Sequence, residues 1–177
     1  MLKNLKTEGK KMSIDKFREE INKGQRFKFG ANWKKFLGTL NVESIKQAET
    51  SLKTMLEVES LKGKSFLDVG SGSGLFSLAA RNLGAKVVSF DLDEVSVDCS
   101  EKLKRAYYEK DISWKVLQGS VLDHDFLKQL NKFDYVYSWG VLHHTGNMWK
   151  ALDNVANLVK PKGILFIALY NYHSSVV

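Results

Sequence analysis

The sequence predicts an α/β fold in which a doubly wound parallel sheet carries helices on both faces. Two observations predict it. Short apolar runs of strand length alternate along the chain with longer segments of helical periodicity. This alternation is typical of βαβ units, and right-handed crossovers between them place helices on both faces of one sheet. The chain has 177 residues, of which 44% are hydrophobic, so it is long enough for one domain with a buried core.

Five strands are expected, each a short apolar run bounded by residues that turn the chain. In chain order they are Ser65–Val69, Lys86–Phe90, Ile112–Leu117, Phe133–Ser138 and Gly163–Leu169. The helices expected between them are Leu75–Leu83, Glu94–Glu109, Asp125–Leu130 and Asn147–Val159. Gly84 follows the first of these helices, in the position of a C-cap glycine. Asp93 precedes the second and is expected to cap it.

Two segments are expected to precede the main domain, which is assigned to residues 61–177. Residues 1–12 are polar and show no period, so a disordered basic tail is predicted there. Residues 13–60 are predicted to form a helical lid or cap region. Ser13 is the expected N-cap of its first helix, and the apolar residues of Val42–Leu56 recur near helical spacing.

The composition limits the compartment in which the protein works. Cys99 is the single cysteine, so no internal disulfide can form, which fits a reducing environment. The basic N-terminus lacks the apolar stretch of a secretory signal. No apolar run approaches the roughly 20 residues needed to cross a bilayer. We therefore expect a cytoplasmic protein without a membrane span.

The net charge of +7 is concentrated at one end of the chain. Residues 1–64 carry 15 Lys and Arg against 8 Asp and Glu, whereas residues 65–177 carry 12 of each. This excess is consistent with attraction to an anionic partner such as RNA, an acidic metabolite or a membrane surface. A solvated, lysine-rich helical face is the favoured alternative, because the lysines are scattered and form no compact block.

The segment Phe66–Gly74, with the sequence FLDVGSGSG, carries the main functional signal. A buried strand runs into three alternate glycines, and a helix opens directly after them. Glycine is needed where the backbone turns sharply and approaches a ligand without a Cβ in the way. The helix N-terminus adds free N–H groups and the positive end of a dipole. The spacing G-x-G-x-G differs from the G-x-G-x-x-G of dinucleotide-binding proteins.

A second feature is an acid at the end of the next strand. Asp91 closes the run Val87–Asp91 and stands 17 residues after Gly74. A carboxylate in that position can accept hydrogen bonds from both hydroxyls of an adenosine ribose, as it does in nicotinamide dinucleotide proteins. The two features together predict a nucleoside site at the ends of the first two strands.

At this point the chain resembles the class I S-adenosylmethionine (SAM)-dependent methyltransferases, from about Leu61 to Tyr170. Phe66–Gly74 resembles the first motif of that family, and Asp91 its ribose-binding acid. The other matching segments are Gln118–Asp123, Phe133–His144 and Val159–Gly163. The pair of histidines is most similar to the small-molecule branch that includes the ubiquinone-pathway O-methyltransferases. The resemblance implies a Rossmann-like core with strand order 3-2-1-4-5 and SAM as the cofactor.

The resemblance also implies which residues bind that cofactor. They are Asp68, Gly70, Ser71, Gly72, Gly74, Asp91, Leu92, Ser120, Val121, Ser138 and Trp139, with Trp33 as part of a lid. Core packing is the alternative role for Trp33 and Trp139, and a structural cap for Asp68. No metal site is expected.

The chain departs from the family pattern in two places. Ser120 stands where an aspartate is commoner, so the adenine amino group would be held by Asp123 or by the main chain. The C-terminal pair of antiparallel strands, which follows the fifth strand in the family, is missing from the sequence. The fifth strand would then be an apolar sheet edge, which predicts either self-association of the protein or cover of the edge by the tail Asn171–Val177.

His143 and His144 are the candidate catalytic residues. Methyl transfer to a hydroxyl requires an aligned nucleophile and the removal of its proton, and a histidine titrates in the right range. Alternatively, one of the two faces the core or caps the helix after Asn147.

Several functions follow from these observations. The leading one is methyl transfer to a small molecule, at oxygen before nitrogen or carbon. Nucleic acid ranks low as a substrate, because Ser138–Val141 replaces the Asn/Asp-Pro-Pro-Tyr/Phe motif expected of an amino-methyltransferase. The alternatives are a truncated, non-catalytic SAM-binding module that self-associates through the fifth strand, or SAM chemistry without methyl transfer.

Overall fold

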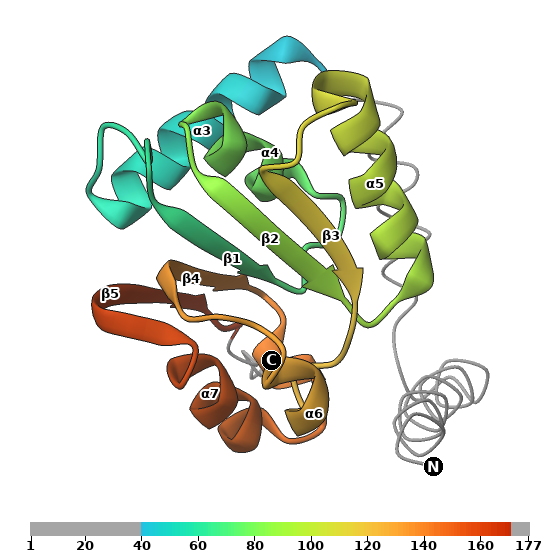
Figure 1. The fold of residues 1–177 in the computed structure, drawn as a ribbon, viewed down its shortest axis with the longest axis vertical. Coiled ribbons are helices and arrows are strands. Elements are labelled where there is room, and N and C mark those ends of the chain that lie inside the picture. The colour runs from blue at the N-terminus through green and yellow to red at the C-terminus, as the bar shows by residue number, and fades with distance from the viewer. Residues whose placement is uncertain (1–39, 171–177) are drawn as a thin grey trace, which may run out of the picture.

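A five-stranded parallel sheet in the order β3-β2-β1-β4-β5 forms the centre of the molecule. The computed structural model of the chain describes residues 40–170 (Figure 1). The strands are β1 (Ser65–Val69), β2 (Lys86–Asp91), β3 (Trp114–Gln118), β4 (Phe133–Trp139) and β5 (Val159–Ala168). This topology confirms the predicted fold class and strand order.

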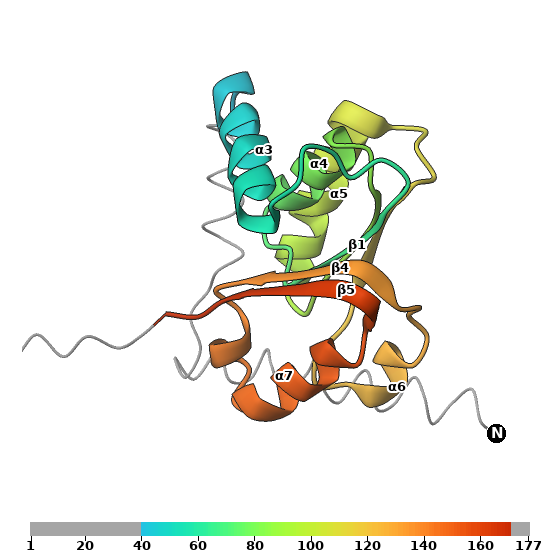
Figure 2. The same cartoon turned by 90° about the vertical axis from the view of Figure 1, so that its left-hand side faces the viewer.

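Helices cover both faces of the sheet. Figure 2 shows the sheet nearly edge-on, with α3, α4 and α5 on one face and α6 and α7 on the other. The helices are α3 (Val42–Leu56), α4 (Leu75–Asn82), α5 (Glu94–Tyr108), α6 (His124–Leu127) and α7 (Met148–Ala156), with the short 3₁₀ helix η1 (Leu142–His144). None of the helices within residues 40–170 is long and apolar enough to cross a membrane.

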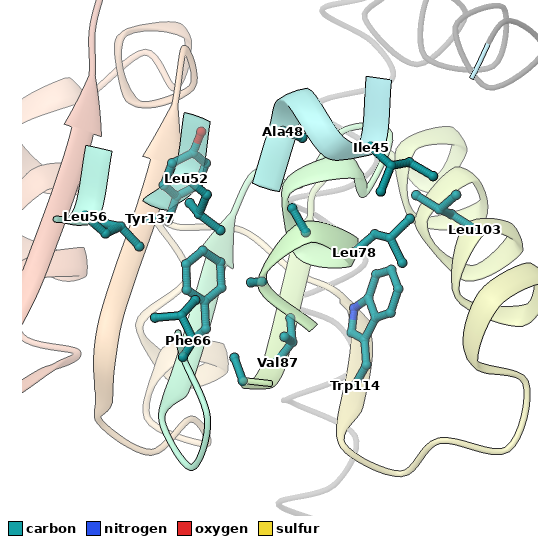
Figure 3. Close-up of a cluster of buried hydrophobic side chains, with 14 residues drawn as sticks. Ile45, Ala48, Leu52, Leu56, Phe66, Leu78, Val87, Leu103, Trp114 and Tyr137 are labelled. Atoms are coloured by element: carbon teal, nitrogen blue, oxygen red, sulfur yellow. The ribbon is translucent and has the colours of Figure 1, made fainter. Parts of the chain in front are cut away.

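The central strand β1 shows how the sequence produces the two-sided core. Four of its five residues are buried, because a parallel strand between two helical layers is covered on both faces. Phe66 points to the α3–α5 layer, where it packs with Leu52 and Leu78 (Figure 3). Leu67 and Val69 point to the opposite layer. The alternation of β1 therefore joins two separate hydrophobic clusters.

Gly84 ends α4 as expected. Its φ is +97°, its N–H donates to the carbonyl of Arg81 at 3.0 Å, and the N–H of Ala85 donates to Ala80 at 3.1 Å. These are the two hydrogen bonds of a Schellman motif, which needs a residue in the left-handed region. Asp93 caps α5, because its Oδ1 accepts from the N–H of Val95 at 3.0 Å. Both capping predictions are confirmed.

The boundary between α7 and β5 was predicted wrongly. The helix expected to reach Val159 ends at Ala156, and the strand expected from Gly163 begins at Val159. Val159 pairs with Phe133, and the register then shifts between Phe133 and Tyr135. The irregular segment around Pro161 therefore lies inside the strand as a bulge rather than in a separate turn.

Other expected boundaries moved by one to three residues. The third strand begins at Trp114, two residues later than expected, and Ile112 is 88% exposed. Helix α6 is a single turn from His124, because Asp123 caps it at that point. The expected domain boundary at residue 61 stays a prediction, and α3 on its N-terminal side packs into the same core as β1 and α4.

The remaining N-terminal predictions lie outside the described residues. They are the tail of residues 1–12, the helix capped by Ser13 and the lid residue Trp33.

Candidate functional site

The glycine-rich turn lies at the carboxyl end of β1 and leads directly into α4. Gly70, Gly72 and Gly74 have φ values of +75°, +53° and +82°, in the left-handed region that favours glycine. The N–H of Gly72 donates to Oδ2 of Asp91 at 3.0 Å. The turn after β1 is thereby joined to the acid at the end of β2, as the sequence predicted for a nucleoside site.

Gly70 and Gly74 are also required by contacts within the protein. A Cβ on Gly70 would lie 2.5 Å from Cγ2 of Val141, and a Cβ on Gly74 would lie 2.8 Å from Oγ of Ser100. Both distances are too short for real atoms. Ser71 is held in the same turn, because its hydroxyl lies 3.2 Å from that of Ser100. The turn is therefore packed tightly against the middle of α5 and the loop after β4.

Asp91 has hydrogen-bonding capacity to spare. One carboxylate oxygen accepts from Gly72, and the other accepts from the N–H of Asp93 at 2.9 Å. An ionised carboxylate has about four lone-pair positions, so roughly two stay available. The pKa of Asp91 is raised to about 6, chiefly by burial and also by the charge of Asp93. The hydrogen bonds from the main chain oppose this rise. The carboxyl group is half-buried and can accept two further donors.

Asp68 is a second, more deeply buried carboxylate beneath the turn. It is 3% exposed, and the hydroxyl of Ser77 on α4 donates to its Oδ2 at 2.5 Å. Burial raises the pKa of Asp68 to about 7; the hydrogen bond from Ser77 opposes this shift and the charge of Asp91 adds to it. A buried acid whose pKa is raised by burial and by a second nearby acid makes this place favourable for a cation.

The residues expected to bind adenine lie beyond β3. Ser120 and Val121 are both buried, and Oγ of Ser120 accepts from the N–H of Leu122 at 3.1 Å. Gln118 donates to the carbonyl of Leu92 at 3.3 Å, which joins the ends of β3 and β2. Oδ1 of Asp123 accepts from two N–H groups at the start of α6. The side chains of Ser120 and Asp123 therefore both hold the turn that follows β3.

At the end of β4, the neighbouring residues Ser138 and Trp139 have different surroundings. Ser138 is fully buried, and its hydroxyl donates to the carbonyl of Val69 at 3.2 Å, so it links β4 to β1. Trp139 is 42% exposed and stacks with Phe76 and Phe166, with ring centroids 6.2 and 6.1 Å away. Trp139 therefore presents an aromatic face at the carboxyl end of the sheet.

The two histidines occupy η1 and differ in their surroundings. Their rings are 3.9 Å apart, with His144 exposed and His143 half-buried. Both ring nitrogens of His143 are buried, and neither has a hydrogen-bond partner within residues 40–170. The ring of His143 meets that of Tyr170 edge-on at 5.2 Å. Such an imidazole can accept a proton from a group that enters beside it.

Two tyrosines near the site were missed by sequence reasoning. Tyr170 lies beyond β5, and its Oη accepts from Nε1 of Trp139 at 3.0 Å. Tyr137 is buried in β4, and its hydroxyl has no hydrogen-bond partner among the described residues. The signal for Tyr137 was present in the sequence, because aromatic residues occupy every second position from Phe133 to Trp139. A tyrosine in such a buried row carries a hydroxyl that must find a partner.

A groove that is separate from this site lies on another part of the described residues. Its volume is about 940 Å³, and it is lined on the α6 side of the sheet by Val88, Leu117, Phe126 and Leu130, among others. It contains none of the glycine-turn residues. It opens because the single turn of α6 covers little of β2 and β3. Within residues 40–170, no cluster of His, Cys, Asp or Glu side chains is arranged to bind a metal ion.

Comparison with known proteins agrees with this geometry. Residues 43–176 match the family model described as "Methyltransferase domain". The chain is 32% identical over 120 residues to a ubiquinone biosynthesis O-methyltransferase of Coxiella burnetii, covering 68% of this chain and 49% of that protein. It is 29% identical over 126 residues to the protein-lysine methyltransferase METTL21E of Mus musculus, covering 67% and 50%. The chain thus spans about half the length of the curated relatives it matches.

A solved structure with the same fold is magnesium protoporphyrin IX methyltransferase from Synechocystis PCC 6803 with bound S-adenosylhomocysteine (SAH). It superposes with a TM-score of 0.59 at 18% sequence identity, covering 75% of this chain and 64% of that chain. The likeness confirms the predicted fold class, and the family match confirms the resemblance recognised in the sequence.

Proposed function

The chain belongs to the methyltransferase domain family, and on that premise we propose that it binds SAM and transfers a methyl group to a small-molecule acceptor, at oxygen. The observation that carries the proposal is the contact between Gly72 and Asp91 at 3.0 Å. It brings a glycine-rich turn and a carboxylate with unused lone pairs together at the ends of adjacent strands. This is the arrangement required to hold one nucleoside.

The residues present fit the cofactor at three points. Asp91 has lone pairs left for two ribose hydroxyls. The position of Ser120 and Val121 just beyond the end of β3 supports a contact with the adenine edge. The buried carboxylate of Asp68 lies under the turn, where a positively charged ammonium group would lower its pKa.

The bound cofactor would supply a methyl group already activated by a positive sulfur atom. The work left to the protein is to align the acceptor and to take its proton. The exposed face of Trp139 suits a sulfonium cation, because aromatic faces attract cations. His143 is the proposed general base, since its ring nitrogens are buried and unpartnered within residues 40–170. Oxygen as the acceptor atom is supported by the name of the Coxiella burnetii relative.

A second candidate is a SAM-binding module that does not catalyse transfer. One observation favours it: β5 is hydrogen-bonded to β4, and within residues 40–170 no strand pairs with its other edge. Ile164 is 41% exposed on this strand. Such an edge favours pairing with another chain, so we propose self-association there. We also propose a cytoplasmic location, because the lone Cys99 is buried and can form no internal disulfide.

Titration calorimetry with SAH tests the cofactor assignment. We expect binding by the full chain and its loss in Asp91→Ala. Asp98→Ala is the matched control, because Asp98 is an exposed acid on α5 with no role in the site. If the wild-type chain does not bind SAH, both SAM-based functions are wrong.

Tritiated SAM then separates catalysis from binding. The protein is incubated with a deproteinised metabolite extract, and in parallel with a dialysed protein extract. Transfer into the metabolite fraction supports the proposal. Transfer into the protein fraction would favour an acceptor like that named for METTL21E, and binding without transfer to either fraction would favour the non-catalytic module.

Light scattering tests the edge of β5. We expect a species larger than the monomer at micromolar concentration, and its reduction in Ile164→Lys. Val42→Lys, at an apolar position on α3 that is 67% exposed, should change nothing. A monomeric wild type would overturn the self-association proposal.

A further inference from the structure

Tyr137 carries a buried hydroxyl to which none of residues 40–170 forms a hydrogen bond. The side chain is 1% exposed, and its Oη has no hydrogen-bond partner within residues 40–170. Its ring is packed on several sides, at 5.1 Å from Phe76 and 5.5 Å from Phe166. Phenylalanine would fill the same space without leaving a polar atom unpaired. An unpaired buried hydroxyl lowers stability, so its presence calls for a partner beyond residues 40–170.

The side chain of Tyr137 lies on the same face of the sheet as that of Asp68. Tyr137 is the register partner of Asp68 on the neighbouring parallel strand, so the two side chains project from the same face. Figure 3 shows the hydroxyl of Tyr137 directed along β4 toward the carboxyl ends of the strands, away from Phe66. The ring of Trp139, which is 42% exposed, stacks against that of Tyr137 with ring centroids 6.5 Å apart.

The electrostatic surroundings keep this hydroxyl protonated. Burial raises the pKa of Tyr137 above its usual range, and the nearby Asp68 and Tyr170 raise it further. The group is therefore available as a hydrogen-bond donor. A donor beside a buried carboxylate matches a zwitterion, whose carboxylate accepts one bond while its ammonium group donates another.

We propose that Tyr137 is a cofactor-binding residue whose hydroxyl donates to the carboxylate at the amino-acid end of SAM, while Asp68 beside it accepts from the ammonium group. The proposal rests on the function proposed above. The nucleoside end of the cofactor has its own partners in Asp91, Ser120 and Val121. The amino-acid end is the part whose charges match Tyr137 and Asp68.

Two probes separate the ends of the cofactor. SAH and 5′-methylthioadenosine share the adenosine and the thioether, but only SAH carries the amino-acid group. Titration calorimetry on the full-length Tyr137→Phe variant should show SAH binding weakened by roughly tenfold. Binding of 5′-methylthioadenosine should stay within about twofold of the wild type. Tyr135→Phe, two residues earlier on β4 and half-buried, should alter neither.

Thermal unfolding gives an independent reading. Without ligand, Tyr137→Phe should unfold at the same temperature as the wild type or higher, because the variant removes an unpaired buried hydroxyl. With saturating SAH, the rise in unfolding temperature should be smaller in the variant than in the wild type.

The outcomes are distinct. Selective loss of SAH binding supports the proposal. Equal loss of both probes would assign Tyr137 a packing role and overturn it, as would unchanged binding of both. A wild type that binds 5′-methylthioadenosine no more weakly than SAH would show that the amino-acid end is not recognised and would overturn this proposal alone. A wild type that binds neither probe would overturn the proposed function as well.

Discussion

The side chain of Val141, in the loop after β4, fills the space in which a Cβ on Gly70 would lie. Cγ2 of Val141 would be 2.5 Å from that atom. The turn after β1 and the loop that leads to the two histidines are therefore in direct contact. Any change in one is transmitted to the other, which makes the contact a good place to test the architecture.

Gly70→Ala should destabilise the protein by about 2–4 kcal/mol, because it adds a clash with Val141 to the strain of a φ of +75°. Gly63→Ala is the matched control, since Gly63 has a φ of +77° and its Cβ would meet no atom within 4 Å. That variant should lose only about 1–2 kcal/mol from strain. Urea unfolding measures both. Equal losses would show that the Val141 contact has no energetic role.

His143→Asn should lower the rate of methyl transfer by about 10²–10⁴-fold while leaving SAH binding within twofold, because a general base acts on the acceptor and not on the cofactor. His144→Asn is the comparison, since His144 is exposed. Rates are measured with tritiated SAM at saturation. A larger effect at His144 than at His143 would reverse the assignment.

The free energy of unfolding should fall as pH rises from about 4 to 8. Asp68 and Asp91 have folded-state pKa values of about 7 and 6 against an ordinary 3.8, so the folded chain holds protons that the unfolded chain releases. Stability is then lost as pH rises through this window, by about 2 kcal/mol or more. Urea unfolding at pH 5 and pH 8 checks the sign.

Asp68→Asn isolates the contribution of the deeper acid. It should raise stability at pH 8 and flatten the decline between pH 5 and pH 8, because the neutral amide needs no proton. Asp98→Asn, at an exposed position, should leave the profile unchanged. A wild type that gains stability from pH 5 to pH 8, with no change in Asp68→Asn, would contradict the interpretation.

Asp134→Asn should destabilise the protein by about 1–3 kcal/mol. Its carboxylate accepts from the main-chain N–H and hydroxyl of Ser65 at 2.8 and 2.7 Å, and from Nζ of Lys160 at 2.9 Å. The hydrogen bond from Lys160 holds the pKa of Asp134 well below its usual range. Thermal and urea unfolding measure the loss. Glu59→Gln, in an exposed ion pair with Lys53, should be neutral by comparison.

Much of the fold could be predicted because its signals are local. The strand Ser65–Val69, the glycine turn and the cap at Gly84 each depend on residues close together in the chain. The start of β5 could not be predicted in this way. Pro161 and Gly163 are typical of a turn, and only pairing with β4 across the bulge makes the segment a strand.

In the site too, features that depend on sequence spacing could be predicted, and features that depend on distant contacts could not. The spacing between the glycines and Asp91 predicts that they lie close together. The hydrogen bond from Gly72 to Asp91 confirms this prediction. The partners of Asp134 come from β1 and β5, which are far apart in the sequence. Nor does the sequence show that the hydroxyl of Tyr137 stays unpaired, because that depends on everything packed around it.

The contacts available at Gly72, Asp91 and Asp68 concern only those parts of the proposed cofactor that methyl transfer leaves unaltered. Apart from the contact proposed between Trp139 and the sulfonium, donor and spent cofactor would then be held with similar strength. Turnover would depend on the removal of the demethylated product, and the enzyme would respond to the ratio of the two forms more than to the amount of either.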